Sequence, residues 1–197
     1  MAAAEEVRAF VALELDAALH ERLERLVEEL RPKVPGLRFG PVGNAHLTMR
    51  FLGPSSASAL ERIATALGPA AAACPPAAVP VTGLGTFPPH GAPRVLWMGL
   101  DLPASMQTLQ AACESAARAA GFDAEARAYQ PHLTLGRWRE RAARPALPEV
   151  EPFATRIERL IVFRSDLKPT GAVHTPLHIL DLGTKDARPV GLTMAGV

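Results

Sequence analysis

The tripeptide His-Leu-Thr occurs twice in this chain of 197 residues, at positions 46–48 and 132–134. In both copies apolar and polar residues alternate, which is the pattern of a β-strand with one buried face. The two copies lie 86 residues apart, and the same offset carries Leu23 onto Leu109. Because a strand, a helix and a His-Leu-Thr strand recur in the same order, we predict two similar β/α lobes related by an approximate two-fold axis. Residues 1–197 would then form one bilobal domain.

Each half of the repeat is predicted to begin with a strand that leads into a helix. Residues 7–15 form the first strand, and Asp16 is a suitable N-cap for the helix that follows. Residues 94–100 form the corresponding strand, and Gly121 ends the corresponding helix. A two-fold axis between such halves would bring the two His-Leu-Thr strands face to face.

The remaining segments carry weaker signals. Ser58 and Glu61 have the spacing of a capping box, and Gly68-Pro69 should end the helix that follows them. Residues 69–80, rich in Ala and Pro, are predicted to be a loop between the halves. The other predictions are strands at 37–39 and 79–84, a loop at 138–152, a hairpin of 156–167 with 173–182 around a turn at 168–171, and a tail of about a dozen residues.

Composition narrows the classes of protein to which the chain can belong. It carries 21 Lys and Arg against 20 Asp and Glu, a net charge of +1, which excludes holding long nucleic acid by bulk electrostatics. No apolar run is long enough for a transmembrane helix, and the start of the chain lacks the basic residues of a signal peptide. Cys74 and Cys113 lack zinc or redox spacing. We therefore expect a cytoplasmic protein with reduced thiols, and a monomer as the default.

The two His-Leu-Thr strands place their polar residues for chemistry. Residues i and i+2 of a strand point to the same side, so His46 shares a face with Thr48, and His132 shares a face with Thr134. Near neutral pH one imidazole can be neutral and the other protonated, so that one removes a proton and the other supplies one. Threonine hydroxyls can donate hydrogen bonds to phosphate oxygens.

Two imidazoles on opposite sides of a phosphorus atom suit an in-line displacement, in which the attacking and leaving oxygens lie opposite each other. Such a pair needs no metal ion to generate the nucleophile, so neither a metal nor another cofactor is predicted. The residues alone leave open which histidine is the acid and which is the base. They also leave open a non-catalytic module that binds RNA ends, and a metallohydrolase that uses both histidines and a carboxylate.

The segments RAFVALELD, HLTMRFLG, PRVLWMGLDL, PHLTLGR and FRSDLKPTG span nearly the whole chain. In this order they resemble the RNA 2′,3′-cyclic phosphodiesterases, historically called 2′-5′ RNA ligases, of the two-histidine phosphoesterase superfamily. The resemblance implies an α/β (α+β) bilobal fold in which two antiparallel sheets line a central cleft, with helices outside. It implies hydrolysis of a terminal 2′,3′-cyclic phosphate, on RNA ends or cyclic nucleotides, to a 2′-phosphate, and a reversible ATP-independent 2′-5′ joining of RNA.

The resemblance also implies a role for each motif residue. His46 would donate a proton to the leaving O3′, His132 would activate water, and Thr48 and Thr134 would hold the phosphate. The chain departs from the family at two places. Phe39-Gly40 stands where a Trp is frequent, and Ala172-Val173-His174 stands where an aromatic residue often follows the late glycine.

Two arginines are candidates for substrate binding. Regular alternation puts Arg50 on the cleft side, although an ion pair at the surface is an equal alternative. The same alternation points Arg137 away from His132, so a twist or strand end is needed for it to reach substrate. Residues 127–168 carry nine basic and five acidic side chains, and with Tyr129 and Trp138 they could stack an RNA end or simply form a solvated loop.

The remaining histidines are weaker candidates. His174 and His178 would share one face of a regular strand and could form a metal pair, but exposed strand histidines are the more frequent case. His20 and His90 are expected to be solvated, and Cys113 is expected to lie in the core.

Overall fold

A computed structural model describes residues 6–169, 171–184 and 187–189. Helices separate most of the strands in the first part of the chain, whereas only strands follow the helix Ala104–Ala119 in the part that the structure describes. In chain order the elements are β1 (Val7–Leu13), α1 (Ala17–Leu30), η1 (Arg31–Lys33), β2 (Leu37–Phe39), η2 (Val42–Asn44), β3 (Leu47–Ser55), α2 (Ala57–Ala73), β4 (Ala77–Phe87), β5 (Val95–Leu100), α3 (Ala104–Ala119), β6 (His132–Trp138), β7 (Ala154–Ile157), β8 (Arg159–Lys168), β9 (Gly171–Asp181) and β10 (Ala187–Pro189).

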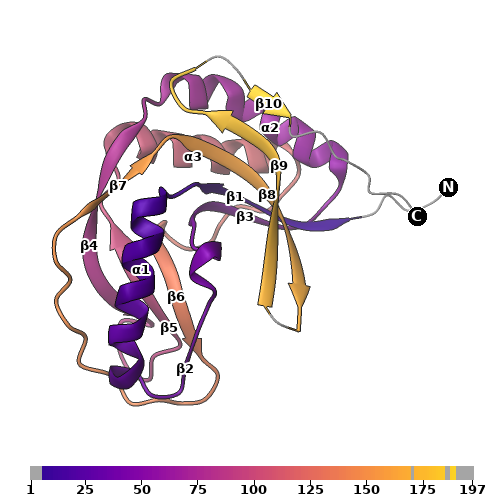
Figure 1. Cartoon of the computed structure of the whole chain (residues 1–197). Coiled ribbons are helices and arrows are strands. Elements are labelled where there is room, and N and C mark those ends of the chain that lie inside the picture. Colours follow the sequence, from indigo (N-terminus) through magenta and orange to yellow (C-terminus); the bar gives the residue numbers. More distant parts are fainter. Residues whose placement is uncertain (1–5, 170, 185–186, 190–197) are drawn as a thin grey trace.

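The strands form two five-stranded sheets (Figure 1). The first sheet has the order β10-β9-β8-β1-β3, and the second has the order β2-β6-β5-β4-β7. Every described strand pair is antiparallel. The expectation of an α+β fold with two antiparallel sheets is therefore confirmed. The two His-Leu-Thr segments enter different sheets, one at β3 and the other at β6.

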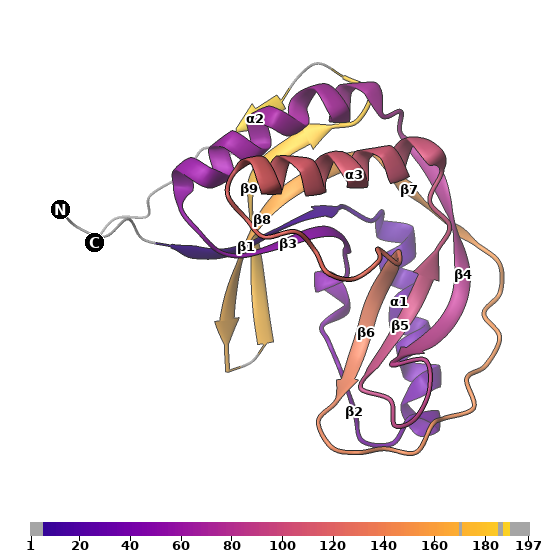
Figure 2. The ribbon, with the colours of Figure 1, turned by 180° about the vertical axis from the view of Figure 1, so that it is seen from behind.

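Helices α1 and α3 each pack against the sheet other than the one that contains the preceding strand. Helix α3 follows β5 of the second sheet, yet it packs beside α2 and against β3 of the first (Figures 1 and 2). Helix α1 follows β1 of the first sheet but contacts β7 of the second. Each half thus supplies a helix to the other half, and the buried residues of both form one continuous core. We interpret the chain as one duplicated unit for this reason, because each sheet packs against a helix that follows a strand of the other sheet, and α2 adds to the cover of β8 and β9.

The start of α1 is capped as predicted. One carboxylate oxygen of Asp16 accepts a hydrogen bond from the Leu19 amide at 2.8 Å, and the other accepts from the Arg156 amide at 2.7 Å. The cap therefore also ties α1 to β7.

The start and end of α2 differ from the prediction. Ser56, rather than Ser58, caps the helix by accepting from the Ala59 amide, and the helix continues through Pro69 to Ala73. Proline in a helix removes one backbone hydrogen bond. Here the buried face continues beyond it with Ala71, so packing in the core outweighs the local stop signal.

Two further predictions are corrected: the loop between the halves at residues 69–80, and the continuous strand at residues 156–167. Residues 69–80 contain the last turn of α2 and the first part of β4 instead of a loop. The segment 156–167 is interrupted at Glu158, because β7 pairs with β4 of the second sheet whereas β8 pairs with β1 of the first. The hairpin itself, β8 with β9, forms as expected.

Within the described ranges, no helix is both long and apolar enough to cross a membrane. Of the predicted C-terminal tail, the backbone of β10 pairs with β9, and residues 190–197 lie outside the described part of the chain.

Candidate active site

The two motif histidines are held in the same way. His46 directly precedes β3, and its Nδ1 lies 2.7 Å from the carbonyl oxygen of Asn44. His132 begins β6, and its Nδ1 lies 2.7 Å from the carbonyl oxygen of Gln130. A carbonyl can only accept a hydrogen bond, so Nδ1 carries the hydrogen in both rings. In the neutral form of each ring Nε2 is then the free, proton-accepting nitrogen, as a general acid–base residue requires.

Aromatic rings surround both imidazoles. The ring of His46 stacks on Phe10 with centroids 4.5 Å apart, and the edge of His174 approaches it at 5.1 Å. The ring of His132 meets Phe87 edge-on at 5.0 Å, and Trp97 lies 6.4 Å away. The rings restrict each imidazole to one orientation and reduce its contact with water.

This enclosure lowers the pKa of both histidines. Burial lowers the pKa of His46 to about 4, with the Asn44 carbonyl opposing the effect and the nearby His174 adding to it. Burial also lowers the pKa of His132, where the Gln130 carbonyl opposes the effect and the charge of Arg137 adds to it. Both rings are therefore neutral at pH 7 in the free protein.

The low pKa of His46 makes stability depend on pH. In the unfolded chain His46 has a pKa near 6.5 and binds a proton below that pH. In the folded chain His46 binds the proton only when the pH approaches 4. Stability therefore rises with pH across this window. We expect acidification from pH 6.5 to pH 4 to cost about 3 kcal/mol through His46 alone. The free energy of unfolding, measured with urea at several pH values, should change less with pH for His46→Asn than for the unmodified protein. An equal change with pH in both proteins would contradict the expectation.

A β-bulge follows the threonine in each motif strand. In β3, Thr48 pairs with Ala12 and Arg50 pairs with Val11, so Met49 is the extra residue. In β6, Thr134 pairs with Trp97 and Gly136 pairs with Leu96, so Leu135 is the extra residue. An extra residue reverses the alternation of side chains beyond it. The two bulges are separated by the same 86 residues as the motifs.

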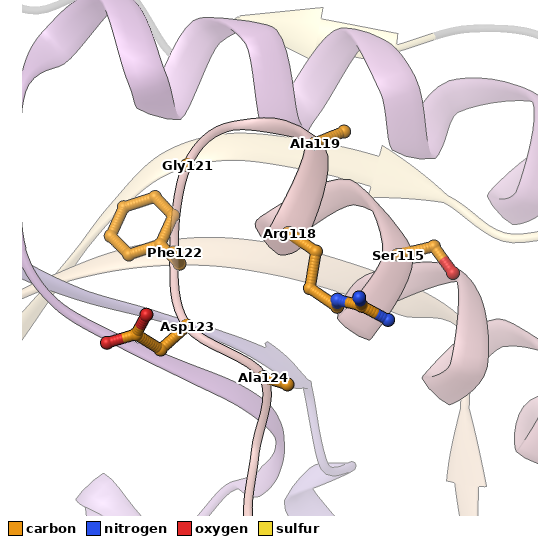
Figure 3. Close-up of a pocket in the computed structure, with 7 residues that line it drawn as sticks. All are labelled: Ser115, Arg118, Ala119, Gly121, Phe122, Asp123 and Ala124. Carbon is orange, nitrogen blue, oxygen red and sulfur yellow. The ribbon is translucent and has the colours of Figure 1, made fainter.

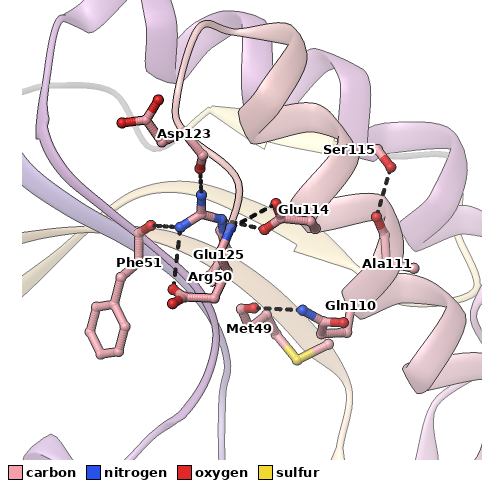
Figure 4. Close-up of polar contacts among 9 residues, drawn as sticks. All are labelled: Met49, Arg50, Phe51, Gln110, Ala111, Glu114, Ser115, Asp123 and Glu125. Carbon is pink, nitrogen blue, oxygen red and sulfur yellow. Dashed lines mark hydrogen bonds and ion pairs between the residues drawn. The ribbon is translucent and has the colours of Figure 1, made fainter. Parts of the chain in front are cut away.

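The bulge in β3 corrects the prediction for Arg50, whose side chain leaves the face of Thr48. Its Nε lies 2.6 Å from Glu114 Oε2 on α3, and its Nη1 lies 3.7 Å from Glu125 Oε2 (Figure 4). Its guanidinium also donates to the carbonyls of Phe51 and Asp123. Only 8% of the residue is exposed. The ion-pair alternative is thus what forms, and it is buried rather than at the surface.

The bulge in β6 has the opposite consequence for Arg137. Because of the bulge, the exposed side chain of Arg137 lies on the same face as Thr134, whereas regular alternation would place it on the opposite face. Arg137 borders the same groove as His132 and Thr134.

A groove of about 890 Å³ collects most of the predicted site residues. Thr48 and Arg50 border it from β3, whereas His132, Thr134 and Arg137 border it from β6. His46 is not among the residues that line this groove; its ring stacks on Phe10, whose ring lies 6.2 Å from that of the lining residue Phe51. Phe87, at the end of β4, also lines the groove. Other lining residues come from the loops before β5 and β6; they include Pro88, Pro89, Arg94, Arg127 and Gln130.

Tyr129 connects the two motif strands, and sequence reasoning missed this role. Its hydroxyl donates to the Thr48 carbonyl at 3.0 Å, and Gln110 donates to the Met49 carbonyl at 3.4 Å. These bonds cover the free edge of β3 and attach to it the segment that leads into His132. Burial raises the pKa of the Tyr129 hydroxyl. Trp138 is only 4% exposed and donates to the Pro35 carbonyl, so the suggestion that it stacks RNA is wrong.

The metal pair of His174 and His178, which the sequence did not favour, is contradicted, and the favoured expectation of exposed histidines is also wrong because both are half-buried. A register shift in β9, where Leu177 is the extra residue, places the two side chains on different faces. His174 approaches His46, whereas His178 Nε2 lies 3.6 Å from Glu61 Oε2 on α2. No cluster of three or more metal-binding side chains occurs among the described residues.

A second hollow lies at the C-terminal end of α3 (Figure 3). Ser115, Arg118, Phe122 and Asp123 line it together with small residues. No motif histidine or threonine borders it, so we do not assign the site there.

Comparison with known proteins shows the family to which the chain belongs. A family model described as the 2′-5′ RNA ligase superfamily matches residues 16–169. The chain belongs to this superfamily. A relative from Methanothermobacter thermautotrophicus, named RNA 2′,3′-cyclic phosphodiesterase, is 30% identical over 184 residues, covering 90% of this chain and all of the relative. A relative of the same name from Thermotoga maritima is 25% identical, covering 87% of this chain and 94% of its own.

Solved structures show the same fold. A protein of Thermus thermophilus superposes with a TM-score of 0.76 at 26% identity, covering 89% of this chain and 98% of its own. Escherichia coli LigT, crystallised with 3′-AMP, superposes with a TM-score of 0.76 at 24% identity, covering 91% of this chain and 100% of its own.

Proposed function

We propose that this protein is an RNA 2′,3′-cyclic phosphodiesterase, which opens a terminal 2′,3′-cyclic phosphate to a 2′-phosphate. One observation carries the proposal: His46 and His132 are each locked by an Nδ1–carbonyl hydrogen bond of 2.7 Å that leaves Nε2 free. A pair of imidazoles in one tautomer is what an acid and base acting on one phosphate require. The names of the relatives support the same activity.

The reaction uses one proton transfer at each end of the displacement. The Nε2 of His132 takes a proton from water, and the water oxygen forms a bond to phosphorus. The bond between phosphorus and O3′ breaks opposite the incoming oxygen, and the Nε2–H of His46 supplies the proton that O3′ needs. This assignment of acid and base rests on the family resemblance. Both transfers are made by side chains, so the step requires no metal ion.

His46 must acquire its proton before it can act as the acid. With a pKa of about 4, about one ring in a thousand is protonated at pH 7 in the free protein. An anionic phosphate beside the ring favours the charged imidazolium. Binding of the substrate therefore favours protonation of His46, and the His46 ring stays neutral when the site is empty.

Thr48, Thr134 and Arg137 complete the phosphate site. The threonines share the face of their histidines, and their hydroxyls can donate to the non-bridging oxygens. The exposed guanidinium of Arg137, near His132, offsets the charge of the phosphate. Arg50 is not included, because its donors are used by Glu114, Glu125 and two carbonyls.

The same geometry accommodates RNA joining. If the 5′-hydroxyl of a second RNA strand replaces water, the identical displacement produces a 2′-5′ linkage, and the free energy comes from the strained cyclic phosphate. No ATP enters this step.

Incubation with 2′,3′-cyclic AMP in excess EDTA tests the function. We expect turnover at an undiminished rate, with 2′-AMP as the product, because the proposed mechanism assigns protonation of O3′ to His46. Product isomers can be separated by chromatography, and the control is the same reaction without chelator. Formation of 3′-AMP would overturn the assignment of the leaving oxygen, and loss of activity in EDTA that added metal restores would overturn the metal-independent mechanism. Salt-sensitive binding of RNA without any turnover would favour the RNA-end-binding module.

A further inference from the structure

Phe51 is an unusual residue of the groove because its large apolar side chain is exposed. Over the described part of the chain, the large hydrophobic residues with the greatest exposure are Phe51 at 53%, Leu167 at 71% and Val173 at 41%. Leu167 and Val173 lie near the end of the β8–β9 hairpin. Only Phe51 of the three borders the groove that contains His132 and Thr134.

The bulge at Met49 brings Phe51 to this position. It moves Arg50 to the buried face and places Phe51 on the face of Thr48, opposite Phe10 in the register. The rings of Phe51 and Phe10 are 6.2 Å apart, and Phe10 in turn stacks on His46. The exposed phenyl ring is thus separated from a reacting imidazole by a single aromatic ring.

The repeat places Arg137 at the position equivalent to Phe51, since the two residues are 86 apart and both follow a bulge. One edge of the groove therefore presents an aromatic face, and the other presents a cation.

The charges of the groove favour an anionic ligand. The two carboxylates in its lining, Glu114 and Glu125, are paired with Arg50. None of the described ion pairs engages Arg94, Arg127 or Arg137, which line the same groove. A flat apolar surface next to unpaired guanidinium groups is the combination that binds single-stranded nucleic acid, with a base on the ring and phosphates near the cations.

We infer that Phe51 is a nucleobase-stacking residue, which makes the protein selective for RNA ends over cyclic phosphates that lack a base. The inference rests on the proposed function, and it assigns Phe51 to substrate selection rather than to proton transfer. Loss of one base–aromatic stack typically weakens binding by about 5- to 150-fold. The effect should therefore fall on KM and leave kcat nearly unchanged.

Two substrates and three variants test the inference. The substrates are adenylyl-adenosine 2′,3′-cyclic phosphate and an analogue in which methoxy groups replace both bases. Phe51→Leu should raise KM for the dinucleotide about tenfold or more and should leave KM for the base-free analogue within about twofold. Phe51→Tyr keeps an aromatic face and should restore the low KM. Leu167→Ala, which removes an exposed apolar side chain outside the groove, is the matched control.

Equal losses on both substrates for Phe51→Leu would overturn the inference, because a disturbed Phe10–His46 stack acts on every substrate. An unchanged KM for the dinucleotide would overturn it as well. Binding of adenylyl-adenosine 2′-phosphate, measured by calorimetry, separates this inference from the proposed function. If the protein turns over neither substrate, the proposed function fails, whereas weaker binding by Phe51→Leu than by Phe51→Tyr still supports the stacking role.

Discussion

Replacing either motif histidine by asparagine is expected to lower kcat/KM for a 2′,3′-cyclic phosphate by about 10²–10⁴. Asparagine can still donate to the carbonyl that Nδ1 contacts in His46 or His132, so the local backbone keeps its partner. What asparagine cannot do is accept or release a proton at the position of Nε2. Steady-state kinetics at pH 7 measures the loss. Circular dichroism and the midpoint of thermal unfolding establish that the variants fold.

The double variant, with both histidines replaced, should lose less than the product of the two single losses, because an acid and a base that act on one displacement work as a unit. The control is His90→Asn, a histidine in an exposed loop between β4 and β5, which should retain full activity. Near-normal activity of either motif variant would refute acid–base catalysis by the pair.

The same variants can assign the acid. A cyclic substrate with sulfur in place of O3′ has a leaving group that needs little protonation. His46→Asn should recover most of its activity on this substrate, and His132→Asn should not. Recovery by His132→Asn instead would exchange the two roles and leave the pair intact.

Arg50→Met is expected to destabilise the fold by about 3 kcal/mol, because it leaves a partly buried carboxylate without its partner. Glu114 on α3 is only 24% exposed, and Arg50 is its ion-pair partner at 2.6 Å. Arg50 also holds the carbonyl of Asp123, at the start of the segment that leads to His132 (Figure 4). Urea unfolding measures the change in the free energy of unfolding.

Arg156→Met is the matched control. Arg156 pairs with Glu158 at 3.1 Å, but both side chains are more than half exposed, so its loss should cost less than about 1 kcal/mol. At a temperature at which Arg50→Met remains folded, its kcat/KM should fall far less than that of the histidine variants. A large loss of activity with unchanged stability would show that Arg50 binds the phosphate after all.

The histidine and threonine of each motif could be singled out from the sequence because the argument for them uses local spacing alone. In both motifs the histidine and threonine come before the bulge, and the pairing of β6 is regular from His132 to Thr134. The Asp16 cap is local in the same sense, since its main partner is three residues away.

Beyond a bulge, the side of the strand that regular alternation assigns to a residue was wrong. Arg50 and Arg137 both follow an extra residue, and both lie on the opposite face from the one that alternation assigns. A register shift in β9 separates His174 from His178, so the two side chains lie on different faces and cannot form a metal pair. The position of a bulge cannot be predicted from hydrophobic periodicity, because it depends on how the strand pairs with its partner.

By itself the sequence determined the recurring order of a strand, a helix and a His-Leu-Thr strand, and the α+β class, because these follow from periodicity and short-range spacing. Only the tertiary structure decided which sheet each helix covers, that Arg50 is an anchor, that Tyr129 joins the motif strands and that Phe51 faces the groove. Those features depend on contacts between residues that are distant in the chain, and their energies are absent from any local pattern.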